Sequence, residues 1–176
     1  MRRHRQLVIT VILACLLGLP VTAPAAGPPT GDGDPGDAEV GLLAGCYRHR
    51  TKDKSFIAKH NQARRARGLA PLRADVHLGK VAKVHTHEMV KRNELYHTSH
   101  TRLANRVTRW STLGENVGVG STVTSLFNAF MNSPGHRANV LYGKFNHIGV
   151  GTRVAYGRLW VTVIFEARND PGTRLC

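Results

Sequence analysis

Apolar residues at helical spacing predict a first amphipathic helix that begins at Ser55 and ends at Gly68. Its apolar face is formed by Phe56, Ala63 and Ala66. The side chains expected outside that face are Lys59, Arg64 and Arg67. Three early histidines fall on polar or loop positions and are expected to be solvated: His49, His60 and His77. The pattern therefore predicts a helix with one buried face and a basic outer face.

A second helix is predicted from Asp75 to about Lys91. The carboxylate of Asp75 can accept hydrogen bonds from the first helical turn and so mark its beginning. Apolar positions recur every three or four residues along this segment and form one stripe: Leu78, Val81, Ala82, His85 and Met89. Because His85 lies within this stripe, we interpret it as a hydrogen-bonded core histidine in preference to a ligand.

The second half of the chain predicts a third helix and a pair of strands. Residues 121–131 carry an apolar face of Val123, Leu126, Phe127 and Phe130, and Pro134-Gly135 ends the pattern. The segments HIGVGTRVA and LWVTVIFEA are rich in residues that favour strands, and YGR between them predicts a hairpin turn. GENVGVG is expected to be a short extended piece. Together these elements predict an α+β domain with helices packed on a sheet.

The N-terminus has the pattern of a secretory signal peptide over residues 1–25. Three arginines precede an apolar run from Leu7 to Leu19, which is shorter than the roughly 20 residues of a membrane span. Ala23 and Ala25 then supply a small-x-small cleavage site. A retained anchor and lipoprotein processing at Cys15 are the less favoured alternatives. The mature chain is therefore expected to be secreted, extracellular and without a transmembrane segment.

The remaining chain divides into three parts. Residues 26–54 form a Gly/Pro/Asp-rich linker and N-terminal extension, residues 55–170 form the folded domain, and residues 171–176 form a tail. Cys46 and Cys176 are the two cysteines left after cleavage, and an even pair in an exported chain favours an intramolecular disulfide. Two separate thiols, or pairing between chains, are the alternatives.

The chain is basic, with 25 Lys and Arg against 11 Asp and Glu and a net charge of +14. Such a protein is expected to concentrate near anionic surfaces, including cell-envelope polymers. A solvated basic surface that aids solubility is the simpler interpretation. Because no arginine-rich block alternates with aromatic residues, sequence-specific binding of nucleic acid is not expected.

Glu115 is the acidic residue with the most unusual surroundings, a stretch of glycines and apolar residues. A buried carboxylate needs partners, which histidines could supply, and an exposed turn glutamate is an equally weighted alternative. None of the ten histidines forms an HExxH pair. The sequence also lacks a nucleophile elbow, a phosphate-binding loop and a dinucleotide-binding fingerprint, which argues against those enzyme classes.

Five segments in order resemble motifs of the CAP superfamily, or SCP domain, in its bacterial secreted branch: HNQARRARGLAPLRAD, HEMVKRNELYHTSH, LGENVGVG, FMNSPGHRANVL and FNHIGVGT with WVTVIFEA. The superfamily includes cysteine-rich secretory, antigen 5 and pathogenesis-related proteins. The resemblance implies an α-β-α sandwich with a central antiparallel sheet between helical layers. It also implies a surface cleft lined in many members by two histidines and two glutamates.

The family's cleft residues carry over to His97, Glu115 and His136. Ser133 occupies the position of the second glutamate, and Phe130 that of the usual tryptophan. With one carboxylate, the resemblance implies at most weak binding of Zn²⁺ by the two histidines. Arg137 and Asn139 are expected to secure the next segment and not to contact a ligand.

The expected function is a binding or interaction module for a small ligand, lipid, metal or cell-wall fragment. An enzyme is less favoured because no activated nucleophile is recognisable. The alternative is a metal-assisted extracellular hydrolase that uses Glu115 with His97 and His136.

Overall fold

The computed structural model describes residues 6–7 and 49–168. Its elements follow in the order β1 (Gln6–Leu7), α1 (Thr51–Arg65), β2 (Arg73–Ala74), α2 (Val76–Arg92), α3 (His100–Arg106), β3 (Thr112–Gly120), α4 (Val123–Asn132), α5 (Pro134–Leu141), β4 (His147–Ala155) and β5 (Arg158–Ala167). The expected linker over residues 26–48, the cleavage site and the disulfide between Cys46 and Cys176 lie outside the described residues and stay predictions. Residues 51–54, expected in the same extension, instead form the first turn of α1.

The sheet has the strand order β1-β3-β5-β4-β2. Its three long strands β3, β5 and β4 are antiparallel, whereas β1 and β2 each add two residues in parallel pairing. The predicted hairpin is confirmed: Ala155 pairs with Arg158, and the turn residues Tyr156 and Gly157 have φ of 54° and 65°. Positive φ at both central residues is the geometry that matches the twist of two-residue hairpins.

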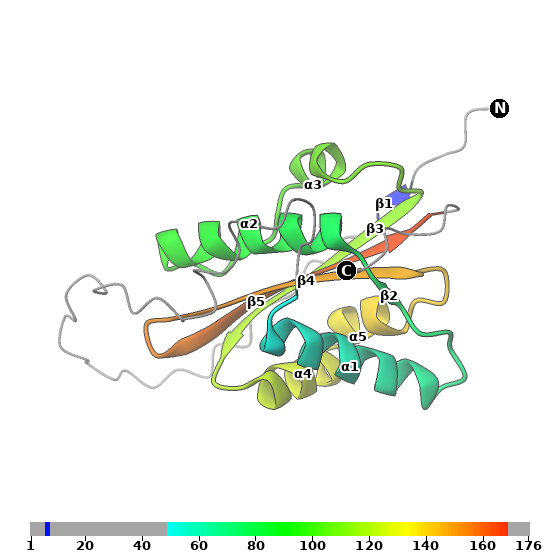
Figure 1. Ribbon diagram of the computed structural model, residues 1–176, viewed down its shortest axis with the longest axis horizontal. Helices are drawn as coiled ribbons and strands as arrows, with labels where there is room; N and C mark the ends of the chain where they lie inside the picture. Colours follow the sequence, from blue (N-terminus) through cyan, green and yellow to red (C-terminus); the bar gives the residue numbers. More distant parts are fainter. Residues whose placement is uncertain (1–5, 8–48, 169–176) are drawn as a thin grey trace.

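Two helical layers cover the sheet, as Figure 1 shows, with α1, α4 and α5 on one face and α2 and α3 on the other. The first layer buries a cluster that includes Phe56, Phe127 and Phe165, and the second buries Leu78, Leu103 and Ile164. The domain is therefore the expected α+β fold with a sheet between helical layers, and its core is antiparallel with short parallel edges.

Two glycines in β4 allow α2 to lie directly on the sheet. A Cβ atom on Gly149 would come within 2.2 Å of the Leu78 backbone, and one on Gly151 within 2.4 Å of the Lys83 backbone. Any side chain at these positions would force helix and strand apart. The HIGVGT segment therefore specifies the close packing of α2 against β4.

The helices α2 and α4 match their predictions, whereas α1 and α3 show what the pattern missed. Asp75 accepts a hydrogen bond from the Leu78 amide at 2.9 Å, and all five residues of the predicted stripe are buried. The helix α1 begins at Thr51, four residues before the predicted Ser55. The short helix α3 was not predicted, because only Leu103 of its residues is buried and no apolar stripe marks it.

Three expectations in and before α1 are wrong. Arg64 and His60 were expected on a polar face, but both are fully buried, and His49 is buried as well. Because α1 is covered on two sides, by the sheet and by α4 and α5, its buried surface is wider than a single amphipathic stripe. The aromatic neighbours of His60 come from α1, α4 and the sheet: Phe56, Phe127 and Phe165.

Arg64 is buried because it binds the backbone of two other segments. Its guanidinium donates to the carbonyl oxygens of Ala70, Val140, Tyr142 and Phe145 at 2.9 to 3.1 Å. Burial lowers the pKa of this guanidinium. These bonds join α1 to the end of α5 and to the loop before β4, and so help to place α5.

Candidate functional site: a histidine–glutamate pair at the edge of the sheet

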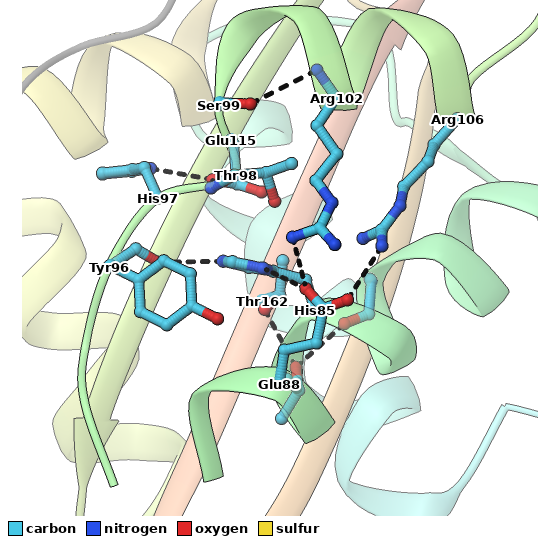
Figure 2. Close-up of polar contacts among 12 residues, drawn as sticks. His85, Glu88, Tyr96, His97, Thr98, Ser99, Arg102, Arg106, Glu115 and Thr162 are labelled. Atoms are coloured by element: carbon cyan, nitrogen blue, oxygen red, sulfur yellow. Dashed lines mark hydrogen bonds and ion pairs between the residues drawn. The ribbon is translucent and has the colours of Figure 1, made fainter. Parts of the chain in front are cut away.

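Glu115 is the central residue of the candidate site, and it is fully buried on β3. Its Oε1 atom lies 2.9 Å from Nδ1 of His97 and accepts a hydrogen bond from the Thr98 amide at 2.8 Å (Figure 2). The sequence left open whether this glutamate is an exposed turn residue or a buried carboxylate with histidine as partner. The structure places it in the second environment.

In a neutral His97, the hydrogen bond to Glu115 Oε1 decides which ring nitrogen carries the proton. Because Oε1 already accepts from the Thr98 amide and the imidazole approaches it through Nδ1, Nδ1 is the donor. Nε2 is then an acceptor on a side chain that is 23% exposed. The second oxygen of Glu115, Oε2, is buried and has no hydrogen-bond partner within residues 49–168.

His136 is positioned by two asparagines that join α5 to β3. The Asn116 amide donates to the His136 carbonyl at 3.1 Å, and Asn139 donates to the Glu115 carbonyl at 3.1 Å and to Asn116 Oδ1 at 2.9 Å. The His136 ring also packs on Phe130, with 4.8 Å between ring centroids. The expectation that Asn139 secures its own segment agrees with these contacts.

The segment around Pro134 is a helix start and not only a helix stop. Ser133 ends α4 and also precedes α5, in which Pro134 occupies the first turn. Proline suits that position because its missing amide hydrogen has no partner there. Ser133 is extended and separates the two helices, and α5 packs against α4 and β3. Ser133 itself is half-buried at this junction.

His136 is kept in its neutral form. Burial and the nearby charge of His97 lower the pKa of His136 to about 4, against the opposing effect of a hydrogen bond with the Val117 backbone. The structure brings His97 into direct contact with Glu115. His136 is held by its own contacts with Asn116 and Phe130.

The donor set fits a three-ligand metal centre poorly. In the part of the chain that the structure describes, no three His, Cys, Asp or Glu side chains form a group able to hold a metal ion. Oε1 of Glu115 is committed to His97 and to the Thr98 amide. The zinc expectation therefore reduces to the two imidazoles, and it stays a prediction.

A second polar cluster lies beside this pair, and the sequence pattern missed it. Figure 2 shows His85 and Glu88 of α2 with Arg102 and Arg106 of α3, next to Tyr96 and His97. The interpretation of His85 as a buried, hydrogen-bonded histidine agrees with its contacts. Its partners were not predicted, because α3 itself was not.

The fold and the site define the class: an α-β-α sandwich with a histidine–glutamate pair on β3, the strand next to the short edge strand β1. The chain belongs to the CAP family, described as the cysteine-rich secretory protein family, which it matches over residues 57–165. It is 35% identical over 115 residues to the uncharacterised protein YkwD of Bacillus subtilis (strain 168). That similarity spans 61% of this chain and 44% of YkwD, so the chain covers less than half of this relative.

Solved structures from other bacteria share the fold. An extracellular protein containing a SCP domain from Bacillus anthracis str. Ames has 27% identity and a TM-score of 0.58, over 66% of this chain and 40% of that one. An outer surface protein from Borrelia burgdorferi has 20% identity and a TM-score of 0.63, over 72% of this chain and 100% of that one. Among residues 6–7 and 49–168, no helix is both long and apolar enough to cross a membrane.

Proposed function

We propose that this chain is a secreted CAP-domain binding module whose ligand contacts His97 and His136 at the edge of β3. The observation that carries the proposal is the fixed His97–Glu115 pair. A buried carboxylate orients one ring nitrogen, and the other is left as an acceptor on a partly exposed side chain. Burial lowers the pKa of His136 to about 4, so this imidazole is also neutral near pH 7.

This chemistry suits a small ligand that donates hydrogen bonds. A neutral imidazole nitrogen accepts from hydroxyl and amide groups, which cell-wall fragments carry in number. The His136 ring rests against the buried Phe130 ring, which holds it in place from the core side. The preferred ligand is therefore a wall fragment or a lipid with a hydroxyl-bearing head group. The description of a similar structure as extracellular supports secretion of this chain as well.

One observation favours the alternative, an extracellular hydrolase. A histidine whose Nδ1 is held by a carboxylate is oriented to act as a general base through Nε2. Cleavage of wall fragments by the protein, abolished in His97→Ala, would favour this alternative over simple binding.

The binding proposal is tested with the purified mature protein. Calorimetry is carried out separately with a soluble wall fragment, with lipid vesicles and with Zn²⁺ alone. We expect one organic ligand to bind and His97→Ala and His136→Ala each to weaken it at least about tenfold, as the loss of about 1.4 kcal/mol would. His87→Ala, on the exposed face of α2, is the matched control. Equal affinity of all variants would place the site elsewhere.

The zinc titration has its own expected outcome. Two imidazole donors without a third protein ligand should bind Zn²⁺ more weakly than the four-ligand sites of structural zinc proteins. His97→Ala and His136→Ala should abolish this weak uptake. Unchanged uptake in both variants would contradict a role for these histidines.

A further inference from the structure

The main chain that carries His97 belongs to no helix or strand. Between the end of α2 and the start of α3, residues 94–99 run as an irregular segment. Two hydrogen bonds anchor it at the site: His85 binds the Tyr96 carbonyl, and Glu115 binds the Thr98 amide. His97 lies between these anchors, so the direction of its imidazole depends on both.

His85 is built into the core as the first of these anchors. It is fully buried on α2, and its Nε2 lies 2.8 Å from the Tyr96 carbonyl oxygen. A carbonyl only accepts hydrogen bonds, so Nε2 carries the proton. The ring also meets the Tyr96 ring edge-on, at 5.0 Å between centroids and 90° between planes. His85 therefore holds Tyr96 through both a hydrogen bond and a ring contact.

Two arginines of α3 act on His85 through Glu88. The Nδ1 atom of His85 faces Glu88 Oε2 at 3.5 Å, and this contact is attractive only when Nδ1 carries a second proton, that is, in the imidazolium form. Glu88 is held by Arg106 at 2.8 Å and by Arg102 at 3.3 Å (Figure 2). Burial raises the pKa of Glu88, but the two arginines outweigh it, and the net pKa is lowered. The carboxylate therefore stays ionised beside the His85 ring.

We propose that His85 is a positioning residue for His97, which fixes the Tyr96 carbonyl and so aims the neighbouring imidazole at Glu115. Glu88, held by Arg102 and Arg106, keeps the His85 ring in the orientation that this requires. The importance of this arrangement for ligand binding rests on the proposed function of His97. The positioning itself is a property of the free protein and is measured without any ligand.

The competing explanation is that His85 only stabilises the core. The two explanations differ in what a substitution does at His97. A core residue contributes to the free energy of unfolding and leaves the His97 tautomer unchanged. A positioning residue also controls the tautomer of His97 and the protection of the Thr98 amide, because both depend on the path of residues 94–99.

The chain offers a matched control in His60. This histidine is also fully buried and also binds a main-chain carbonyl, that of Phe56 at 2.7 Å. It lies on the opposite face of the sheet, within the layer of α1 and α4. His60→Phe should therefore lower stability and leave the His97 segment as it is.

The experiment compares wild type, His85→Phe, His85→Gln and His60→Phe by NMR. Nitrogen-15 shifts report the tautomer of His97, and hydrogen exchange reports the protection of the Thr98 amide. In His85→Phe we expect a mixture of His97 tautomers and exchange at Thr98 faster by roughly five- to tenfold, as expected for one lost hydrogen bond. His85→Gln restores a donor to the Tyr96 carbonyl and should return both readouts toward wild type. His60→Phe should change neither.

Two results would overturn the proposal. One is a folded His85→Phe protein with the wild-type His97 tautomer and the wild-type exchange rate at Thr98. The other is an equal change of both readouts in His60→Phe. If His85→Phe does not fold, Glu88→Gln takes its place: a partial change in the same direction supports the proposal, and none overturns it. Failure of every ligand to bind would refute the proposed function and leave these readouts intact.

Discussion

Glu115 and Asn116 are neighbours on β3 whose side chains leave the strand on opposite faces of the sheet and each hold a distant segment in place. Glu115 pairs across the sheet with Ile164, on the face covered by α2 and α3, and binds His97 and Thr98. Asn116 points to the other face and binds the His136 carbonyl and Asn139 of α5. The alternation of the strand thus lets neighbouring residues of β3 hold His97 from one layer and the His136 main chain from the other.

Asn116 and Asn139 should contribute more to the free energy of unfolding than exposed asparagines do. Asn139→Ala removes donors to the Glu115 carbonyl and to Asn116, and it leaves buried acceptors unpaired. We expect a loss of about 1–3 kcal/mol in the free energy of unfolding. Urea denaturation measures it. Asn128→Ala, on the exposed face of α4, is the control and should change stability by less than about 0.5 kcal/mol.

Arg64→Met should be among the most destabilising single substitutions in the described chain. It removes the donor to four carbonyl oxygens and leaves them without that partner in the core. We expect a loss of about 3 kcal/mol or more, since each unpaired buried acceptor costs about 1–3 kcal/mol. Thermal and urea unfolding test this against Arg67→Met, whose side chain is exposed. Similar stabilities of the two variants would contradict the assigned role.

Stability should fall as the pH is lowered from about 6.5 to about 4. Burial lowers the pKa of His60 from 6.5 to about 4, outweighing its bond to the Phe56 carbonyl, and the pKa of His136 is likewise about 4. In this window the unfolded chain binds more protons than the folded one, so protons favour unfolding. The contribution of His60 is on the order of 3 kcal/mol above pH 6.5 and is lost toward pH 4.

The measurement for this prediction is the free energy of unfolding at several pH values. His60→Phe removes one of the histidines whose protonation opposes folding, so its stability should depend less steeply on pH between 4 and 6.5 than that of wild type. His87→Phe alters an exposed histidine and should keep the wild-type slope. Parallel curves for wild type and His60→Phe would refute the assignment.

The basic charge should produce weak adhesion that depends on salt. At a net charge of +14 for the full sequence, attraction to an anionic wall polymer acts over about 10 Å at 0.1 M ionic strength. We expect sedimentation with anionic polymer at low salt and its loss as salt rises beyond about 0.15 M. Adhesion that is indifferent to salt would point to a specific contact instead.

The expected disulfide between Cys46 and Cys176 is checked by mass spectrometry of the unreduced mature protein. Closing a loop of this length should stabilise the fold by roughly 4–5 kcal/mol in the chain-entropy model, so reduction should lower the unfolding temperature. Two free thiols in the oxidised, exported protein would rule the bond out.

Features that follow from local rules could be predicted from the amino-acid sequence. Asp75 could be identified as a helix cap, and the stripe through Leu78 and Met89 as a buried face, because a carboxylate before a 3.6-residue period has few other interpretations. The hairpin turn at YGR could also be predicted, because two strand patterns joined by a glycine-containing turn specify a hairpin. The family motifs also marked His97, Glu115 and His136 as candidates.

Which polar side chains are buried, and which partners they bind, depends on the packing of distant segments. Arg64 and His60 lie at positions that a single helix would expose, and they are buried because α4, α5 and the sheet close around α1. The sequence is equally compatible with an exposed Glu115. In the structure, the Tyr96–Thr98 segment packs against this residue and binds its carboxylate. Burial and pairing depend on which segments meet across the sheet, and helical or strand periodicity carries no information about segments so far apart in the chain.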